Sequence, residues 1–265
     1  MEYFDSHAHY NDGRFAEEYP GGADAAIRDA YDLGIRYILN AGTNPETSRE
    51  SIALAEQYPF MYAAVGLHPE DAMHIPDSDI PRVLNDIRSL AAHAKVVAIG
   101  EIGLDYHWEP MDKPLQMAFF DGQMQIARDL DLPVIIHDRE AHADTLAIVK
   151  EFPSLRGVFH CYSGSAEMAR QLVDKGWYIG FTGVLTFKNA RKAVEVAQSI
   201  PLERIVLETD CPYMSPEPFR GKRNDPGKLY RMAEKLAEIR GLSVEEIHRI
   251  TTENGKRLYR IGSEV

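Results

Sequence analysis

Two histidines near the start of the chain could bind a metal ion. His7 and His9 lie two residues apart at the end of a short apolar stretch, in the sequence FDSHAH. Because side chains alternate along an extended strand, both imidazoles are expected on one face, at the carboxyl end of a strand. A His-x-His pair also occurs in ordinary packing, so its meaning depends on ligands elsewhere in the chain.

Four further candidate ligands each follow a short apolar run of their own. They are Glu101, His137, His160 and Asp210. Imidazole and carboxylate ligands together suit Zn, Mn, Fe, Co or Ni, and also Mg where carboxylates dominate. Six ligands exceed the four of a closed structural zinc site. The pattern therefore predicts two divalent metal ions that share a bridging carboxylate.

Glu101 is the predicted bridge between the two ions. One ion would be bound by His7, His9 and Asp210, and the other by His137 and His160. Two ions about 3.5–4 Å apart can generate a hydroxide nucleophile at neutral pH and stabilise charge on the attacking and leaving oxygens. Asp210 is then the predicted general base for that water. These residues indicate a metal-dependent hydrolase.

The elements that must position these ligands are strands alternating with helices. Strands are expected to end near His9, Asn40, Gly66, Glu101, His137, His160, Phe181 and Glu208. Their bodies, such as residues 134–136, lack polar alternation, which indicates a parallel sheet covered by helices. Eight such repeats over 265 residues predict an α/β fold, a (β/α)8 TIM-like barrel forming a single domain over residues 1–265. In a barrel of this kind the strand ends meet, which would bring the candidate ligands together.

Local signals mark several helix starts. Asn44 and Asp225 each precede a proline, which places a capping side chain before the first helical position. Pro114 opens a helical segment that runs to residue 129. Ser243, with Glu246 three residues later, predicts a capping box for the last helix.

Composition limits the partners and the compartment. The chain has 29 basic and 41 acidic residues, a formal net charge of −12, so no global field attracts nucleic acid. A polyanion would need a local basic patch and bound cations.

The two cysteines, Cys161 and Cys211, are expected to be buried and fit a reducing compartment. Neither a signal sequence nor an apolar run of the ~18 residues that a membrane span needs is found. We expect a cytoplasmic protein with no membrane association and no obligate protein partner.

The candidate ligands lie in motifs that resemble those of the TatD family of metal-dependent deoxyribonucleases, within the amidohydrolase superfamily. The motifs are FDSHAH at 4–9, AVGLHP at 64–69, GEIGLDY at 100–106, IH at 136–137, FHCYSG at 159–164, LETDCPY at 207–213, RGKRN at 220–224 and TTEN at 251–254. The resemblance implies a TIM-like barrel, a divalent-metal centre and hydrolysis of phosphodiester bonds, typically at DNA ends. Many superfamily relatives bridge their metals with a carboxylated lysine. Here Glu101 lies at that strand end, whereas Lys95 lies at the beginning of the strand.

Other residues are candidates for substrate contact. His68, in the sequence GLHP, is a candidate catalytic donor to a phosphate oxygen or the leaving group, and the alternative is a loop histidine bonded to backbone. Candidate phosphate contacts in the predicted catalytic-face loops are Arg139, Arg220, Lys222 and Arg223. Candidate base-stacking residues are Tyr106 and Tyr162, and also Trp108 and Tyr213. The alternative for each is structural, as a solvated charge or as a ring that covers the core. The histidines expected to be solvated are His74, His93, His142 and His248.

The most specific prediction is a deoxyribonuclease that removes nucleotides from the 3′ end of single-stranded DNA. Its cofactors would be two divalent ions of Zn, Mn, Mg, Co or Ni. One alternative is a binuclear-metal hydrolase of a small amide, lactone or phosphoester, and another is a non-catalytic binding barrel with structural metal. The basic loop at 220–223 favours DNA over the first alternative. The excess of ligands over a closed site disfavours the second.

Overall fold

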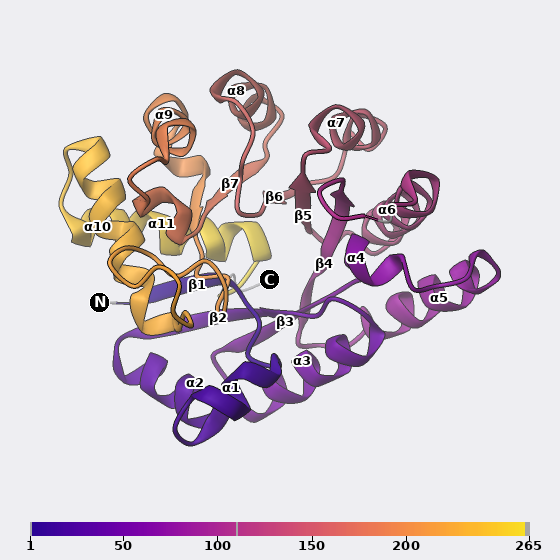
Figure 1. The fold of residues 1–265 in the computed structure, drawn as a ribbon, viewed down its shortest axis with the longest axis horizontal. Coiled ribbons are helices and arrows are strands. Elements are labelled where there is room, and N and C mark those ends of the chain that lie inside the picture. The colour runs from indigo at the N-terminus through magenta and orange to yellow at the C-terminus, as the bar shows by residue number, and fades with distance from the viewer. Residues whose placement is uncertain (1, 110, 263–265) are drawn as a thin grey trace. The chain divides into compact units, whose positions relative to one another are not determined.

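The computed structural model describes residues 2–109 and 111–262 of the chain. Its eight strands are parallel and take the sheet order β1 to β8, which is their order in the sequence. Helices alternate with the strands, as the colour gradient of Figure 1 shows. This is the (β/α)8 arrangement, so the predicted fold class is confirmed. The described residues form two compact units, one comprising the chain up to Asn40 and from Cys161 onward, the other Ala41 to His160. The single domain over residues 1–265 stays a prediction.

The first unit comprises the first and last parts of the described chain. Its elements are β1 (Tyr3–Ala8), α1 (Gly13–Glu18), α2 (Gly22–Asp32), β2 (Ile35–Ala41, of which only the last residue belongs to the second unit), α8 (Ala166–Asp174), β7 (Tyr178–Phe181), η2 (Gly183–Thr186), α9 (Arg191–Ser199), η3 (Leu202–Arg204), β8 (Ile205–Leu207), η4 (Pro226–Lys228), α10 (Leu229–Arg240) and α11 (Val244–Tyr259). Strand β1 pairs in parallel with β2, and β7 pairs in parallel with β8.

The second unit is the middle of the chain. Its elements are α3 (Pro45–Gln57), β3 (Met61–Val65), α4 (Pro69–Ala72), η1 (Asp77–Asp79), α5 (Ile80–Leu90), β4 (Val96–Asp105), α6 (Lys113–Leu130), β5 (Val134–Arg139), α7 (His142–Lys150) and β6 (Gly157–Phe159). The four strands β3 to β6 pair in parallel with their neighbours in sequence order.

The strand bodies are buried on both faces, as their unbroken apolar runs predict. Ile135 and Ile136 in β5 have no exposed surface. In α6, Leu115, Phe119 and Ile126 are buried, so the helix presents an apolar face to the core. Burying a side chain of this size contributes about 1.5–3 kcal/mol. This core fixes the strands whose carboxyl ends carry the candidate ligands.

Most of the helix-start predictions are confirmed. Asn44 caps α3, and Ser243 forms a capping box with Glu246 at α11. Helix α6 begins at Lys113, one residue before the predicted proline. The prediction for Asp225 is wrong in part, because a short 3-10 turn follows it and its side chain makes no capping bond. No helix among the described residues combines the length and the apolar character that a membrane crossing requires.

His248, expected to be solvated, is buried in α11. It is only 2% exposed, and its ring centroid lies 3.8 Å from that of Tyr3 in β1. Its Nε2 has no hydrogen-bond partner among the described residues. Burial lowers the pKa of His248 to about 4. The folded protein therefore keeps this imidazole neutral at pH values where the unfolded chain protonates it.

This difference predicts a pH-dependent loss of stability. His248 contributes fully above pH 6.5, the ordinary histidine pKa, and its contribution falls as the pH decreases toward 4. In His248→Phe, which keeps a ring against Tyr3, that loss disappears. Between pH 7.5 and 4.5 the unfolding free energy of the parent should fall by on the order of 2–3 kcal/mol more than that of the variant. Urea denaturation at the two pH values measures this, and equal decreases would refute it.

Candidate metal centre

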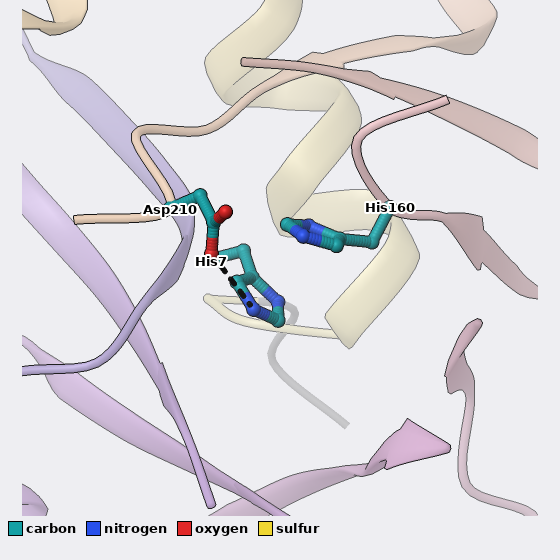
Figure 2. Close-up of side chains that lie close together, drawn as sticks. All are labelled: His7, His160 and Asp210. Atoms are coloured by element: carbon teal, nitrogen blue, oxygen red, sulfur yellow. Dashed lines mark ion pairs between the residues drawn. The ribbon is translucent and has the colours of Figure 1, made fainter. Parts of the chain in front are cut away.

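The first unit brings three of the predicted ligands together. His7 lies in β1 and His9 just after it, and alternation places both rings on one side of the strand. Their Nε2 atoms are 3.0 Å apart. The Asp210 carboxylate, after β8, lies 3.4 Å from His9 Nε2 and 3.8 Å from His7 Nε2, the latter pair being dashed in Figure 2. His160, also drawn in Figure 2, belongs to the second unit.

Backbone bonds hold these three side chains in place. The N–H of Asp210 donates to the carbonyl of His7 at 2.9 Å, and the N–H of His9 donates to the carbonyl of Cys211 at 2.8 Å. Asp210 has a positive φ of 54°, a backbone conformation that aspartate and asparagine tolerate better than most residues. The ends of β1 and β8 are therefore tied together at the ligands themselves.

A buried polar network lies beneath this set. Thr209 donates to the Asp5 carboxylate from its backbone N–H at 2.8 Å and from its hydroxyl at 2.6 Å. Asn224 Nδ2 donates to the carbonyl of Thr209 at 2.7 Å. Burial raises the pKa of Asp5 to about 7. The Asn224 side chain, which follows the basic loop, thus fixes the backbone of the residue before Asp210.

The second unit brings the other predicted ligands together around Glu101. The Glu101 Oε1 atom lies 2.9 Å from His137 Nδ1, 3.9 Å from His160 Nε2 and 3.8 Å from His68 Nε2. Ligand atoms of His68, Glu101 and His137 all lie within 4.8 Å of one another. Glu101 is buried and is not at the end of its strand, because β4 continues to Asp105.

The spacing and chemistry of both sets fit divalent ions. Nitrogen and oxygen ligands bind Zn²⁺ at about 2.0–2.2 Å, which in a tetrahedral site places neighbouring ligand atoms about 3.3–3.6 Å apart. The nitrogen and oxygen atoms of the first set are 3.0–3.8 Å apart. Each unit thus carries a set of imidazole and carboxylate donors with the spacing that a bound cation needs.

Asp105 is a candidate functional residue that the sequence reasoning did not single out. Its Oδ2 lies 2.9 Å from His137 Nε2, on the opposite side of the ring from Glu101. Burial lowers the pKa of His137, but bonds to both carboxylates outweigh this effect and raise the pKa to about 9. A cation at Nδ1 would replace that proton, while Nε2–H continues to donate to Asp105 and orients the ring. Strand alternation signals this role, because Asp105 follows Glu101 by four residues in β4.

Replacing Asp105 with asparagine is expected to weaken divalent-metal binding about 10- to 100-fold, because the candidate ligand His137 loses the carboxylate that orients it. The matched control is Asp138→Asn. Asp138 pairs with His142, outside the set, at 2.8 Å, and metal binding in this variant should stay within about twofold of the parent. Metal titration by calorimetry measures both, and equal affinities in parent and Asp105→Asn would exclude the orienting role.

His68 makes the backbone contact that was the alternative prediction for it, and its catalytic role stays a prediction. Its Nδ1 accepts a hydrogen bond from the N–H of Glu70 at 3.1 Å and so caps α4. A neutral imidazole that accepts at Nδ1 carries its proton at Nε2, the nitrogen that faces Glu101. The loop histidine is bonded to backbone, and that bond leaves an N–H donor directed toward the ligand set.

The predicted phosphate-binding residues differ in solvent exposure and in the contacts that they already make. Arg220 and Lys222 are exposed, and Arg139 is half-buried. Arg223 has its Nε 3.7 Å from the Glu18 carboxylate, and its guanidinium lies 4.6 Å from the centre of the Tyr19 ring. These contacts give Arg223 a structural role in the first unit.

The predicted stacking residues Tyr162 and Tyr106 differ in burial and in the contacts of their rings. Tyr162 is 6% exposed, and its hydroxyl donates to the carbonyl of Ser165 at 2.8 Å. A buried ring offers no face to a base, so we do not retain Tyr162 as a stacking residue. Tyr106 is half-buried, bonded through its hydroxyl to Asp144 at 2.8 Å, with the Lys113 ammonium 4.0 Å from its ring centre.

The two cysteines differ in exposure. Cys211 is buried as predicted, and burial raises the pKa of its thiol well above the ordinary value. Cys161 is only partly buried, so that expectation is wrong for it. Its Sγ lies 3.2 Å from Thr182 Oγ1, and its backbone N–H donates to Glu208 at 2.6 Å.

Comparison with known proteins identifies the family. Residues 4–260 match the family model described as TatD related DNase. The chain is 44% identical over 260 residues to YabD of Bacillus subtilis, described as a metal-dependent hydrolase, covering 97% of this chain and 99% of that one. It is 32% identical over 265 residues, 97% of this chain and 99% of the other, to the 3′-5′ ssDNA/RNA exonuclease TatD of Salmonella typhimurium.

A solved structure supports the same assignment. The crystal structure of YJJV, a TatD homolog from Escherichia coli K12, has a TM-score of 0.89 and 32% sequence identity, covering 98% of each chain. The match spans almost all of the chain, including both ligand sets described above. The chain therefore belongs to the TatD family of metal-dependent hydrolases.

Proposed function

We propose that this hydrolase cleaves phosphodiester bonds in single-stranded DNA, removing nucleotides from the 3′ end. The observation that carries the proposal is the pair of histidine–carboxylate sets, whose donor atoms lie 2.9–3.9 Å apart. The family description and the exonuclease relative direct the choice of substrate toward nucleic acid.

The proposed ligand assignment follows the sequence prediction. His7, His9 and Asp210 would hold one divalent ion, His137 and His160 would hold another, and Glu101 would be the bridging carboxylate. When bound, such ions supply an activated water and stabilise the charge that develops on the phosphate. Zn, Mn, Mg, Co and Ni are all compatible with these donors.

The chain's own residues then have distinct tasks. Asp210 accepts the proton of the attacking water. His68, whose Nδ1 is occupied by the N–H of Glu70, donates from Nε2 to a phosphate oxygen or to the leaving oxygen. Arg139, Arg220 and Lys222 contact the phosphates and so orient the strand. The acidic chain thus binds a polyanion through local charge and bound cations.

A substrate panel tests the proposal. Metal-loaded protein is incubated with single-stranded DNA labelled at the 5′ or the 3′ end, single-stranded RNA, a lactone, an amide and a phosphotriester. Stepwise shortening of 5′-labelled DNA from its 3′ end is expected. Turnover of RNA but not DNA would show that the substrate is RNA and not DNA. Turnover of a small molecule alone would favour the small-substrate hydrolase, and no turnover at all would favour the binding barrel.

A further inference from the structure

The segment that follows β4 presents an exposed tryptophan. Trp108 is 54% exposed, whereas the other tryptophan of the chain, Trp177, is 3% exposed. An indole has a flat apolar face on which a nucleic-acid base can stack. A single exposed aromatic residue is common on protein surfaces, so a functional role requires that the ring be held in place near the site.

Neighbouring side chains hold the Trp108 ring. The Arg139 guanidinium carbon lies 5.2 Å from the ring centre, and the His107 ring packs edge-on against it at 4.7 Å. His107 Nδ1 lies 2.8 Å from the Glu140 carboxylate. Trp108 is therefore supported by His107 after β4 and by Arg139, which is the last residue of β5 and does not lie in a loop.

The same segment is tied to the second ligand set. The backbone N–H of His107 donates to Asp105 Oδ1 at 2.8 Å, and the other oxygen of Asp105 lies 2.9 Å from the candidate ligand His137. The N–H of Tyr106 also donates to the carbonyl of Arg139 at 2.9 Å. One carboxylate thus orients a metal ligand and fixes the backbone that carries Trp108.

We infer that Trp108 and Arg139 form a platform for one nucleotide of a single-stranded substrate. The indole stacks on the base and the guanidinium contacts the adjacent phosphate. The inference rests on the proposed nuclease function and adds to it how the strand is positioned. Because every base has a π-face, such a platform tolerates any sequence. Tyr106 is less suited to this role, since its ring is covered by Lys113 and its hydroxyl is engaged by Asp144.

The test measures binding separately from cleavage. Metal-loaded protein is titrated with a phosphorothioate-linked oligothymidylate, which resists hydrolysis, and with the same strand lacking bases. Because Trp177 is buried, quenching of tryptophan fluorescence by the base-containing strand reports on Trp108. Trp108→Ala should abolish this quenching and weaken binding of the base-containing strand about 5- to 150-fold, measured by the polarisation of a labelled strand. Binding of the baseless strand should not change.

Two further variants distinguish stacking from a structural effect. Trp108→Phe, which retains an aromatic face, should recover most of the lost affinity. Tyr230→Ala, which removes an exposed ring on α10, should bind both strands like the parent. Equal weakening of both strands by Trp108→Ala, or unchanged binding, would overturn the platform.

If cleavage of ordinary DNA is seen but Trp108→Ala binds normally, the nuclease proposal stands and the platform fails. If base-dependent binding is seen without cleavage, the platform stands and the nuclease fails.

Discussion

Asp210→Asn is expected to lower kcat/KM for a single-stranded oligonucleotide by about 10²–10⁴-fold, the range over which a positioned general base contributes. Asparagine has the shape of aspartate but accepts a proton poorly and carries no negative charge for the cation. It also tolerates the positive φ of 54° at this position, so the fold should persist. Steady-state kinetics on metal-loaded protein, together with a thermal melt, measure both effects.

The matched control for this change is Asp131→Asn. Asp131 has a similar positive φ of 51° at the end of α6, where it pairs with Arg156. The same substitution there removes a charge in the same backbone conformation but touches no candidate ligand. Its kcat/KM should stay within about twofold of the parent. If the Asp210 variant retained the activity of this control, Asp210 would be neither a ligand nor the base.

Glu101→Gln is expected to remove a metal ion together with activity. The Glu101 carboxylate is the only acidic member of the His68, Glu101 and His137 group, and a neutral amide neither bridges cations nor balances their charge. We expect elemental analysis to find two divalent ions per parent chain and at most one per variant chain. Hydrolysis should fall by at least about 10²-fold, in line with the loss of two-metal stabilisation.

Glu203→Gln controls for the charge change in that experiment. Glu203 is exposed in η3, away from the ligands, and this variant should keep two ions and full activity. If the Glu101 variant kept two ions, Glu101 would not be the bridging ligand. If that variant had also lost activity, Glu101 would act on the substrate or on a proton.

The positions of the candidate ligands at strand ends could be predicted from the sequence because their signal is local. His7 and His9 fall on one face by strand alternation alone, and each other ligand comes directly after, or close to the end of, an apolar run. The barrel then follows from the alternation of buried strands with helices. The sequence does not point to Asp105 because its apolar run predicts a strand end near Glu101, whereas β4 continues for four residues beyond it.

Burial of polar residues was harder to predict, because it depends on partners distant in sequence. Helix α11 buries His248, Thr252 and Asn254. Asn254 Nδ2 donates to the carbonyls of Leu202 and Ile205 at 2.8 Å each. These acceptors come close to Asn254 only in the folded chain, so the sequence does not reveal that this polar helix face is buried. The same reason explains Tyr162, whose ring lies in the interior although it follows His160 in a candidate site loop.

The ammonium group of Lys95 donates to the carbonyls of Tyr58, Pro59 and Met61 at 3.1–3.3 Å, before β4 begins. Held in this way before the strand, Lys95 is not positioned to bridge ions at Glu101, so the proposed centre needs no lysine carbamate. Metal-depleted protein should therefore regain its ions from a degassed, bicarbonate-free buffer, unlike relatives whose centres need a carbamate. The rate at which the enzyme becomes active in a cell would then follow the supply of metal and not that of carbon dioxide.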